Sequence, residues 1–101
     1  MNDKTPIAVE QGRDNVFIDL GFEPEMAANL KIRADLILAL QKYIKEKNWN
    51  QEQAANFFQE TQPRISNLMN GDIDKFSIDK LVTMIIRAGM QIKIEVITKA
   101  A

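Results

Sequence analysis

The sequence predicts a mainly α-helical domain that ends in one β-strand. Apolar residues recur at three- and four-residue spacing through most of the chain, as in helices that bury one face. Five such stretches begin at a capping residue or a proline. From Met90 to Thr98 the period changes to two, which is typical of a half-buried strand. A chain of 101 residues is sufficient for one core and therefore for one domain.

Composition and charge exclude several classes of protein. The chain is 46% hydrophobic and 27% charged, as in ordinary soluble proteins, and it contains no cysteine or histidine. These absences remove disulfides, thiolate chemistry and the usual general base and metal ligand, so we expect no enzyme, no metal and no cofactor. No apolar run is long enough for a transmembrane helix and the start lacks a signal-peptide pattern, so we expect a cytoplasmic protein without a membrane partner.

Charge is distributed unevenly along the chain. The net charge is −1, but residues 1–30 hold six acidic and two basic residues, whereas residues 31–101 hold eight acidic and eleven basic residues. The two parts therefore carry net charges of −4 and +3. The basic part is compatible with modest non-specific attraction to nucleic acid.

The N-terminal residues predict an arm and a short helix. Residues 1–13 are polar and have no regular period, which indicates a flexible arm or, alternatively, a partner-binding tail. Asp14 is placed to cap a short helix that Gly21 ends. The expected packing face of this helix consists of Val16, Phe17 and Leu20. Residues 14–101 form the expected domain.

A long central helix is predicted to begin at Pro24, because a proline at the first position loses no hydrogen bond, and to run to Lys47. Its expected buried stripe consists of Leu30, Ala34, Ile37, Leu40 and Ile44, widened by Leu36, Leu38 and Tyr43. Asn48 ends the helix, and Trp49 is expected to lie in the core.

Residues 50–71 predict two short helices joined by a tight turn. Asn50 caps the first helix, and Gln53 three positions later completes a capping box. Thr61 caps a second helix from Gln62 to Asn70, and Gly71 ends it in a left-handed conformation. Its inner face carries Ile65, Leu68 and Met69, and its outer face is rich in amides. This pattern predicts a helix-turn-helix that contacts DNA in the major groove.

The outer face of the second helix supplies candidate base contacts. Asn and Gln bond adenine through two hydrogen bonds, and Arg bonds guanine in the same way. Gln62 lies at the exposed start of the helix, where such proteins reach base edges. We therefore expect base contacts from Gln62, Pro63, Arg64 and Asn67. Pro63 would contribute an apolar contact, and Arg64 would bind guanine or a phosphate.

Candidate phosphate contacts surround these residues. The free N–H groups at the start of the first helix suit a phosphate, and the Gln51 amide adds a donor there. The full expected set consists of Gln51, Ser66, Asn70, Lys75 and Lys80. The alternative for each is an ordinary solvated side chain.

The remaining residues predict a loop, a helix and the strand. After a loop at 72–75, Ser77 caps a helix that Gly89 ends, and Phe76 is expected to pack on Leu81. Its expected buried face consists of Ile78, Leu81, Val82, Ile85 and Ala88. The strand has Met90, Ile92, Ile94 and Val96 on one face.

A lone strand needs a partner for its backbone groups. Pairing with a second copy would give a two-fold dimer, with Ile92, Ile94 and Val96 as dimerisation residues. The alternatives are pairing with residues 16–18 or with a different protein.

The stretch NQEQAANFFQETQPRISNLMNG resembles the helix-turn-helix of the Cro/cI-type (XRE) family of regulators. The similarity extends over residues 14–98, in a layout similar to a subgroup that includes HigA-like antitoxins. The resemblance implies a five-helix, lambda-repressor-like DNA-binding domain and a dimeric repressor bound to a double-stranded operator. It also implies a possible second role as the antitoxin of a toxin–antitoxin pair. The alternative function is neutralisation of an RNA-cleaving toxin mainly by protein–protein contact.

Carried over to this chain, the resemblance places Gln51 at a phosphate and Gln62, Pro63 and Asn67 at bases. The turn departs from the family pattern, which has glycine and then an apolar residue where this chain has Gln59 and Glu60. A left-handed Gln59 would cost about 1 kcal/mol relative to glycine. A distorted turn or a longer first helix would avoid that cost, and Glu60 places an acid near the DNA-facing side.

Overall fold

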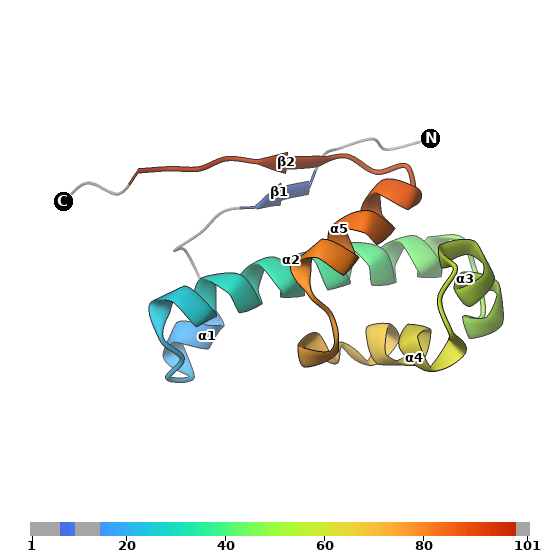
Figure 1. Cartoon of the computed structure of the whole chain (residues 1–101), viewed down its shortest axis with the longest axis horizontal. Helices are drawn as coiled ribbons and strands as arrows, with labels where there is room; N and C mark the ends of the chain where they lie inside the picture. The colour runs from blue at the N-terminus through green and yellow to red at the C-terminus, as the bar shows by residue number, and fades with distance from the viewer. Residues whose placement is uncertain (1–6, 10–14, 99–101) are drawn as a thin grey trace.

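The computed structural model describes residues 7–9 and 15–98. The described part is mainly helical, as predicted, with α2 as its longest element (Figure 1). No helix within it is long and apolar enough to cross a membrane. In chain order the elements are β1 (Ile7–Val9), α1 (Val16–Asp19), α2 (Pro24–Glu46), α3 (Gln51–Phe58), α4 (Gln62–Asn70), the 3-10 turn η1 (Ile73–Lys75), α5 (Ile78–Arg87) and β2 (Ile92–Ile94).

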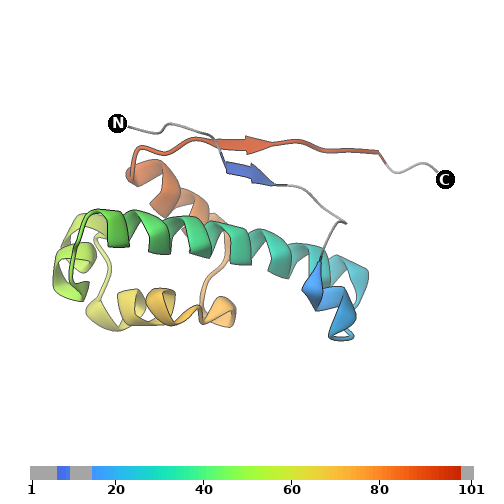
Figure 2. The same ribbon diagram turned by 180° about the vertical axis from the view of Figure 1, so that it is seen from behind.

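Helix α2 is the axis on which the other helices pack. Pro24 occupies its first turn, and its 23 residues span about 35 Å. Helix α1 packs at its N-terminal end, α3 follows its C-terminal end, and α5 crosses its middle (Figures 1 and 2). Asn48, which was predicted to end this helix, has a left-handed φ of 59° just after it. The helix-turn-helix therefore begins just after the C-terminal end of α2.

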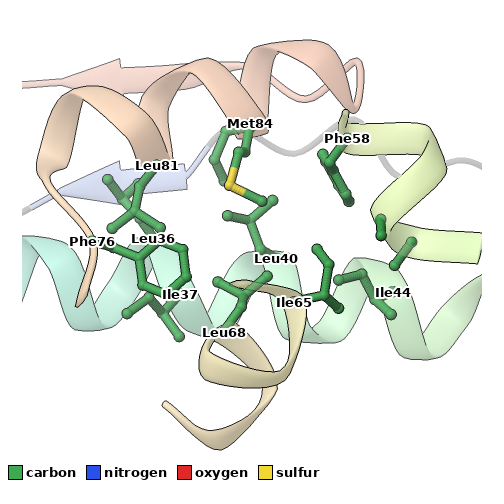
Figure 3. Packing of buried hydrophobic residues seen from close by; sticks show 13 residues of the cluster. Leu36, Ile37, Leu40, Ile44, Phe58, Ile65, Leu68, Phe76, Leu81 and Met84 are labelled. Atoms are coloured by element: carbon green, nitrogen blue, oxygen red, sulfur yellow. The ribbon is translucent and has the colours of Figure 1, made fainter. Parts of the chain in front are cut away.

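The core lies between α2 and the pair formed by α4 and α5. Figure 3 shows Leu40 between Met84 of α5 and Leu68 of α4, all three of them buried. Phe76 and Leu81, the predicted packing pair, are both buried. The most deeply buried large side chains, each at most 2% exposed, are Leu36, Leu40, Ile65, Leu68, Phe76, Leu81 and Ile85.

The buried stripe of α2 is narrower than predicted. Leu30, Ile37, Leu40 and Ile44 are buried as expected, but Ala34 is only half-buried. Leu38, expected to widen the stripe, is 61% exposed. At 100° per residue, position 38 points away from its neighbour Leu40 by about 200°. The prediction for Leu38 is therefore wrong.

Asn15, rather than the predicted Asp14, caps α1. The Asn15 side-chain oxygen accepts a hydrogen bond from the Phe17 backbone N–H at 2.9 Å. Its amide nitrogen donates to the Ala27 carbonyl of α2, also at 2.9 Å. An ionised aspartate has no N–H to donate, so asparagine alone satisfies both partners. Asp14 itself lies outside the described residues.

Helix α1 also buries less than predicted. Phe17 is half-buried, whereas Val16 and Leu20 of the expected packing face are exposed. The helix has only four residues; the Asn15 amide bonds it to α2, and the Phe17 ring packs edge-on against Phe22 with ring centres 6.1 Å apart. Its other apolar side chains remain at the surface.

Strand β2 finds a partner within its own chain. It pairs in parallel with β1, and the aligned residues are Ile7 with Ile92 and Val9 with Ile94 (Figure 1). Residues 7–9 therefore do not belong to a structureless arm, and the other residues before Asn15 lie outside the described part. The prediction of a strand without a partner in its own chain is therefore wrong. A three-residue strand is too short to show a detectable alternating pattern.

The strand is also shorter than predicted, because residues 95–98 have no regular structure. Met90 and Ile92 are half-buried against the core. Ile94 and Val96, which were expected on the same half-buried face, are 68% and 89% exposed. Their apolar surface is not covered by the described part of the chain.

Candidate DNA-binding surface

The start of α3 is fixed by the predicted capping box. The Asn50 side chain accepts a hydrogen bond from the Gln53 backbone N–H at 2.8 Å, and the Gln53 side chain accepts one from the Asn50 N–H at 2.9 Å. Gln51 and Glu52, in the first turn, are exposed. The exposed first turn therefore presents backbone N–H groups and the Gln51 amide, which suits a phosphate.

The ends of α4 are fixed as predicted. The Thr61 hydroxyl accepts a hydrogen bond from the Arg64 N–H at 3.2 Å. Gly71 has a φ of 76°, and its N–H donates to the Leu68 carbonyl at 3.0 Å. Both ends of the helix therefore have the conformation that the sequence indicated.

Gln41 of α2 adds an anchor that sequence reasoning missed. Its side-chain amide donates to the Leu68 carbonyl at 2.9 Å and to the Met69 carbonyl at 3.3 Å. These are carbonyls of the last turn of α4, and the Leu68 carbonyl also accepts the Gly71 N–H. The contact joins residues 27 apart in the sequence, so no local pattern signals it. The contact joins the C-terminal end of α4 to α2.

The two faces of α4 have the predicted polarity. Ile65 and Leu68 are fully buried and Met69 is half-buried. The outer side chains are Gln62, Pro63 and Asn70, which are exposed, and Ser66 and Asn67, which are half-buried. The outer face therefore presents amides, a hydroxyl and one apolar ring.

The turn between α3 and α4 keeps the tight geometry despite its sequence. Gln59 adopts a left-handed conformation with φ 59° and ψ 43°, and α3 ends at Phe58. The Glu60 N–H donates to the Ala55 carbonyl at 2.9 Å. The two arrangements expected to avoid a left-handed Gln59, a distorted turn and a longer first helix, do not occur. The chain instead accepts the conformational cost at Gln59.

Glu60 lies at the centre of a charge cluster. Its side chain is 11% exposed, and one carboxylate oxygen lies 2.6 Å from the Lys80 ammonium nitrogen of α5. The other oxygen lies 3.8 Å from the Arg64 Nε. Arg64 also donates to the Lys75 carbonyl at 3.1 Å, and its guanidinium carbon lies 4.8 Å from the centre of the Phe76 ring. Arg64 and Lys80 thus both pair with one carboxylate beside the first turn of α4.

The predicted contact residues occupy two different environments. Gln51, Gln62, Pro63 and Asn70 are exposed, as is the side chain of Lys75. Arg64 and Lys80, in contrast, are partly exposed and paired with Glu60. Arg64 lies only four residues after Glu60, so that pair has a local spacing, but Lys80 is 20 residues away and no local pattern signals it.

Comparison with known families supports the reading of this geometry. A sequence model described as a helix-turn-helix domain matches residues 16–97, which is most of the chain. The chain belongs to this helix-turn-helix family. No match was found among curated proteins. Membership covers all five helices and both capped ends of the motif, and it indicates a DNA-binding regulator with DNA as its partner.

Proposed function

We propose that this helix-turn-helix protein is a cytoplasmic, sequence-specific transcriptional regulator that represses by binding a DNA operator as a dimer. The observation that carries the proposal is α4 itself. The helix is anchored at both ends and by two buried side chains, Ile65 and Leu68, while its outer face presents amides. A major groove about 12 Å wide admits one such helix.

The proposed base contacts come from the outer face of α4. Gln62 and Asn67 are placed to bond adenine, and Pro63 to contact a thymine methyl group. Arg64 contributes a base contact only if its guanidinium leaves Phe76 and the Lys75 carbonyl. The proposed phosphate contacts, which fix the register on the duplex, are Gln51, Ser66, Asn70 and Lys75, with Lys80 available only after it leaves Glu60.

The proposed dimer uses the C-terminal segment. One edge of β2 pairs with β1, and within the described residues its other edge has no partner. Ile94 and Val96 expose apolar surface beside this edge. Pairing of two copies there, with Ile92, Ile94 and Val96 at the contact, would cover that surface and bring two α4 helices into one assembly. A Val96→Asp variant is expected to be monomeric by sedimentation, whereas an unchanged mass would contradict this interface.

Selection of bound duplexes from a random DNA pool tests the proposal as a whole. We expect a near-palindromic site whose half-sites are separated by about 34–36 Å, one turn of the duplex. Binding that is equally strong for all sequences at every salt concentration would contradict sequence-specific regulation. An asymmetric site one half as long would contradict the dimer and leave the DNA-binding role intact.

A second candidate function, neutralisation of a toxin, is favoured by the surface of α1 and the start of α2. Five large apolar side chains are exposed there within eleven residues: Val16, Ile18, Leu20, Phe22 and Met26. Three exposed carboxylates, Asp19, Glu23 and Glu25, lie among them, and residues 15–30 contain no lysine or arginine. An open hollow of about 470 Å³ beside Met26, lined also by Glu23, Glu25, Asn29 and Arg33, continues this surface. The combination suits a basic protein partner with apolar contact residues.

Co-expression with the product of the neighbouring gene tests this candidate. A small basic protein that co-purifies with the chain, and whose toxicity the chain suppresses, is the expected result. Leu20→Ser is expected to weaken that complex at least about tenfold, because it removes exposed apolar contact area. Ile86→Ser, a similarly exposed change on α5, is the matched control. Equal weakening by both variants, or no complex, would contradict docking at α1.

A further inference from the structure

The cluster around Glu60 separates two kinds of cation on the proposed DNA-binding surface. The Lys75 side chain is exposed. Lys80 and Arg64 are held by one carboxylate that is itself only 11% exposed, at 2.6 Å and 3.8 Å. We propose that Glu60 is a specificity-determining residue, which lowers non-specific DNA affinity by withholding Lys80 and Arg64 from phosphates. This inference rests on the proposed DNA-binding function.

The competition between carboxylate and phosphate is direct. The Lys80 ammonium group and the Arg64 guanidinium are partly open to solvent, with side chains 39% and 35% exposed. A phosphate that approaches the first turn of α4 therefore competes with Glu60 for either cation. Because Glu60 is largely buried, its ion pairs are screened by salt less than an exposed pair would be. Non-specific binding consists almost entirely of phosphate contacts, so it loses most from this competition.

The cluster also directs Arg64 away from the groove. Its guanidinium stacks over Phe76 and donates to the Lys75 carbonyl, so three interactions hold it against the domain. Arginine is the most adaptable binder of guanine and phosphate, and a free Arg64 would add affinity for many sequences. With Arg64 held, base contact falls to Gln62 and Asn67, which discriminate by hydrogen-bond pattern. The ratio of specific to non-specific affinity rises as a result.

The Gln59–Glu60 turn acquires a function in this proposal. Its left-handed Gln59 and its acid both depart from the pattern that the sequence resemblance leads one to expect. The acid is the part that reaches Arg64 on the next turn and Lys80 on α5. An apolar residue at position 60 would leave both cations without a carboxylate. In this proposal Glu60 lowers the affinity for non-specific DNA and so raises the ratio of specific to non-specific affinity.

The test compares Glu60→Gln with Glu52→Gln on the full chain. Both variants remove one negative charge from the motif, but Glu52 is exposed in the first turn of α3 and belongs to no ion pair among those found in the described residues. Binding is measured against the selected operator and against a scrambled duplex from 50 to 200 mM salt. Each new phosphate contact steepens the slope of log affinity against log salt by about 0.9, or about 3.5-fold in affinity over this range.

We expect Glu60→Gln to steepen the slope on scrambled DNA by one or two such contacts and to lower the specificity ratio at least about 3-fold. Glu52→Gln is expected to change the slope by less than about half a contact. Adding Arg64→Gln to Glu60→Gln should remove part of the steepening, because one of the two released cations is then absent. Thermal melts of every variant establish that the fold persists.

Equal steepening by both Glu→Gln variants would overturn the proposal, because net charge alone would then explain the effect. If Glu60→Gln fails to fold, Glu60→Asp takes its place. It keeps the charge but shortens the reach to Lys80, and it is expected to lower the specificity ratio in the same direction. Failure of the wild-type chain to bind any duplex would instead contradict the DNA-binding function, so the two failures are distinguishable.

Discussion

Apolar side chains have opposite surroundings in the helix-turn-helix (residues 50–71) and in the two segments that flank the domain (residues 15–22 and 92–98). In the motif, Ala54, Ala55, Phe58, Ile65 and Leu68 are at most 5% exposed, and Phe57, at 36%, is an exception. In the flanks, Val16, Ile18, Leu20, Phe22, Ile94, Val96 and Ile97 are 45–89% exposed. The chain itself supplies what packs the motif, whereas the flanks retain apolar surface suited to other molecules.

The comparison also separates two uses of polar groups. In the motif they fix backbone ends, as at Asn50 and Thr61, and so hold a rigid outer face. In the N-terminal flank the Asn15 amide holds the helix, and the Asp19 carboxylate is exposed among apolar side chains. A rigid polar face suits groove recognition, and an adaptable apolar one suits a protein partner.

Leu68→Ala against Leu20→Ala is the strongest test of this contrast. Leu68 is fully buried and its truncation leaves a cavity, so we expect a loss of about 2–5 kcal/mol in the free energy of unfolding. Leu20 is 68% exposed, and the same truncation there should cost less than about 0.5 kcal/mol. Urea denaturation followed by circular dichroism measures both. Similar losses in the two variants would show that the flank packs as tightly as the motif.

Asn67→Ala tests whether the outer face of the motif distinguishes bases. Loss of a bidentate contact should reduce discrimination at one operator position by about 1–3 kcal/mol, roughly 5- to 150-fold in relative affinity. Asn70→Ala, at the exposed end of the same helix, is the control and should weaken all sequences alike. The measurement is competition between operators that differ at one base pair. Uniform weakening by Asn67→Ala would reassign that residue to the phosphate backbone.

Local patterns in the sequence were sufficient for most of the motif. The caps Asn50, Thr61 and Ser77 and the stop at Gly71 depend on neighbours within four residues, and all were confirmed. Helical periodicity likewise placed Ile65 and Leu68 in the core. These features depend on the geometry of a single helical turn, so the residues that determine them are close together in the sequence.

Contacts between distant residues could not be predicted. The choice of Asn15 over Asp14 depends on the Ala27 carbonyl, because both residue types cap helices well. The pairing of Ile7 with Ile92 spans 85 positions, and Glu60 meets Lys80 only because α5 folds back on the turn. For the candidate site, local patterns therefore predicted which residues lie on the outer face of α4, but not that Arg64 and Lys80 pair with Glu60.

The smallest expected effect concerns the one place where the motif tolerates an unfavourable backbone conformation. Gln59 has a φ of 59°, and the left-handed conformation costs a non-glycine residue about 1–2 kcal/mol. Gln59→Gly removes that cost but adds freedom to the unfolded chain worth about 0.5–1 kcal/mol. We therefore expect a net gain in stability on the order of 0.5–1 kcal/mol, measured by urea denaturation.

Asn48→Gly is the matched control, because Asn48 has the same φ of 59° at the end of α2. Asparagine tolerates the left-handed region better than glutamine, so its replacement should change stability little. An equal gain at both positions would mean that Gln59 carries no special strain. A loss at Gln59 would mean that its side chain, whose amide lies 3.4 Å from the Asn56 carbonyl, stabilises the turn more than that distance indicates. If the gain is found, Gln59 lowers the free energy of unfolding, whereas Glu60 pairs with Arg64 and Lys80. The two residues that depart from the family pattern then have separate physical effects.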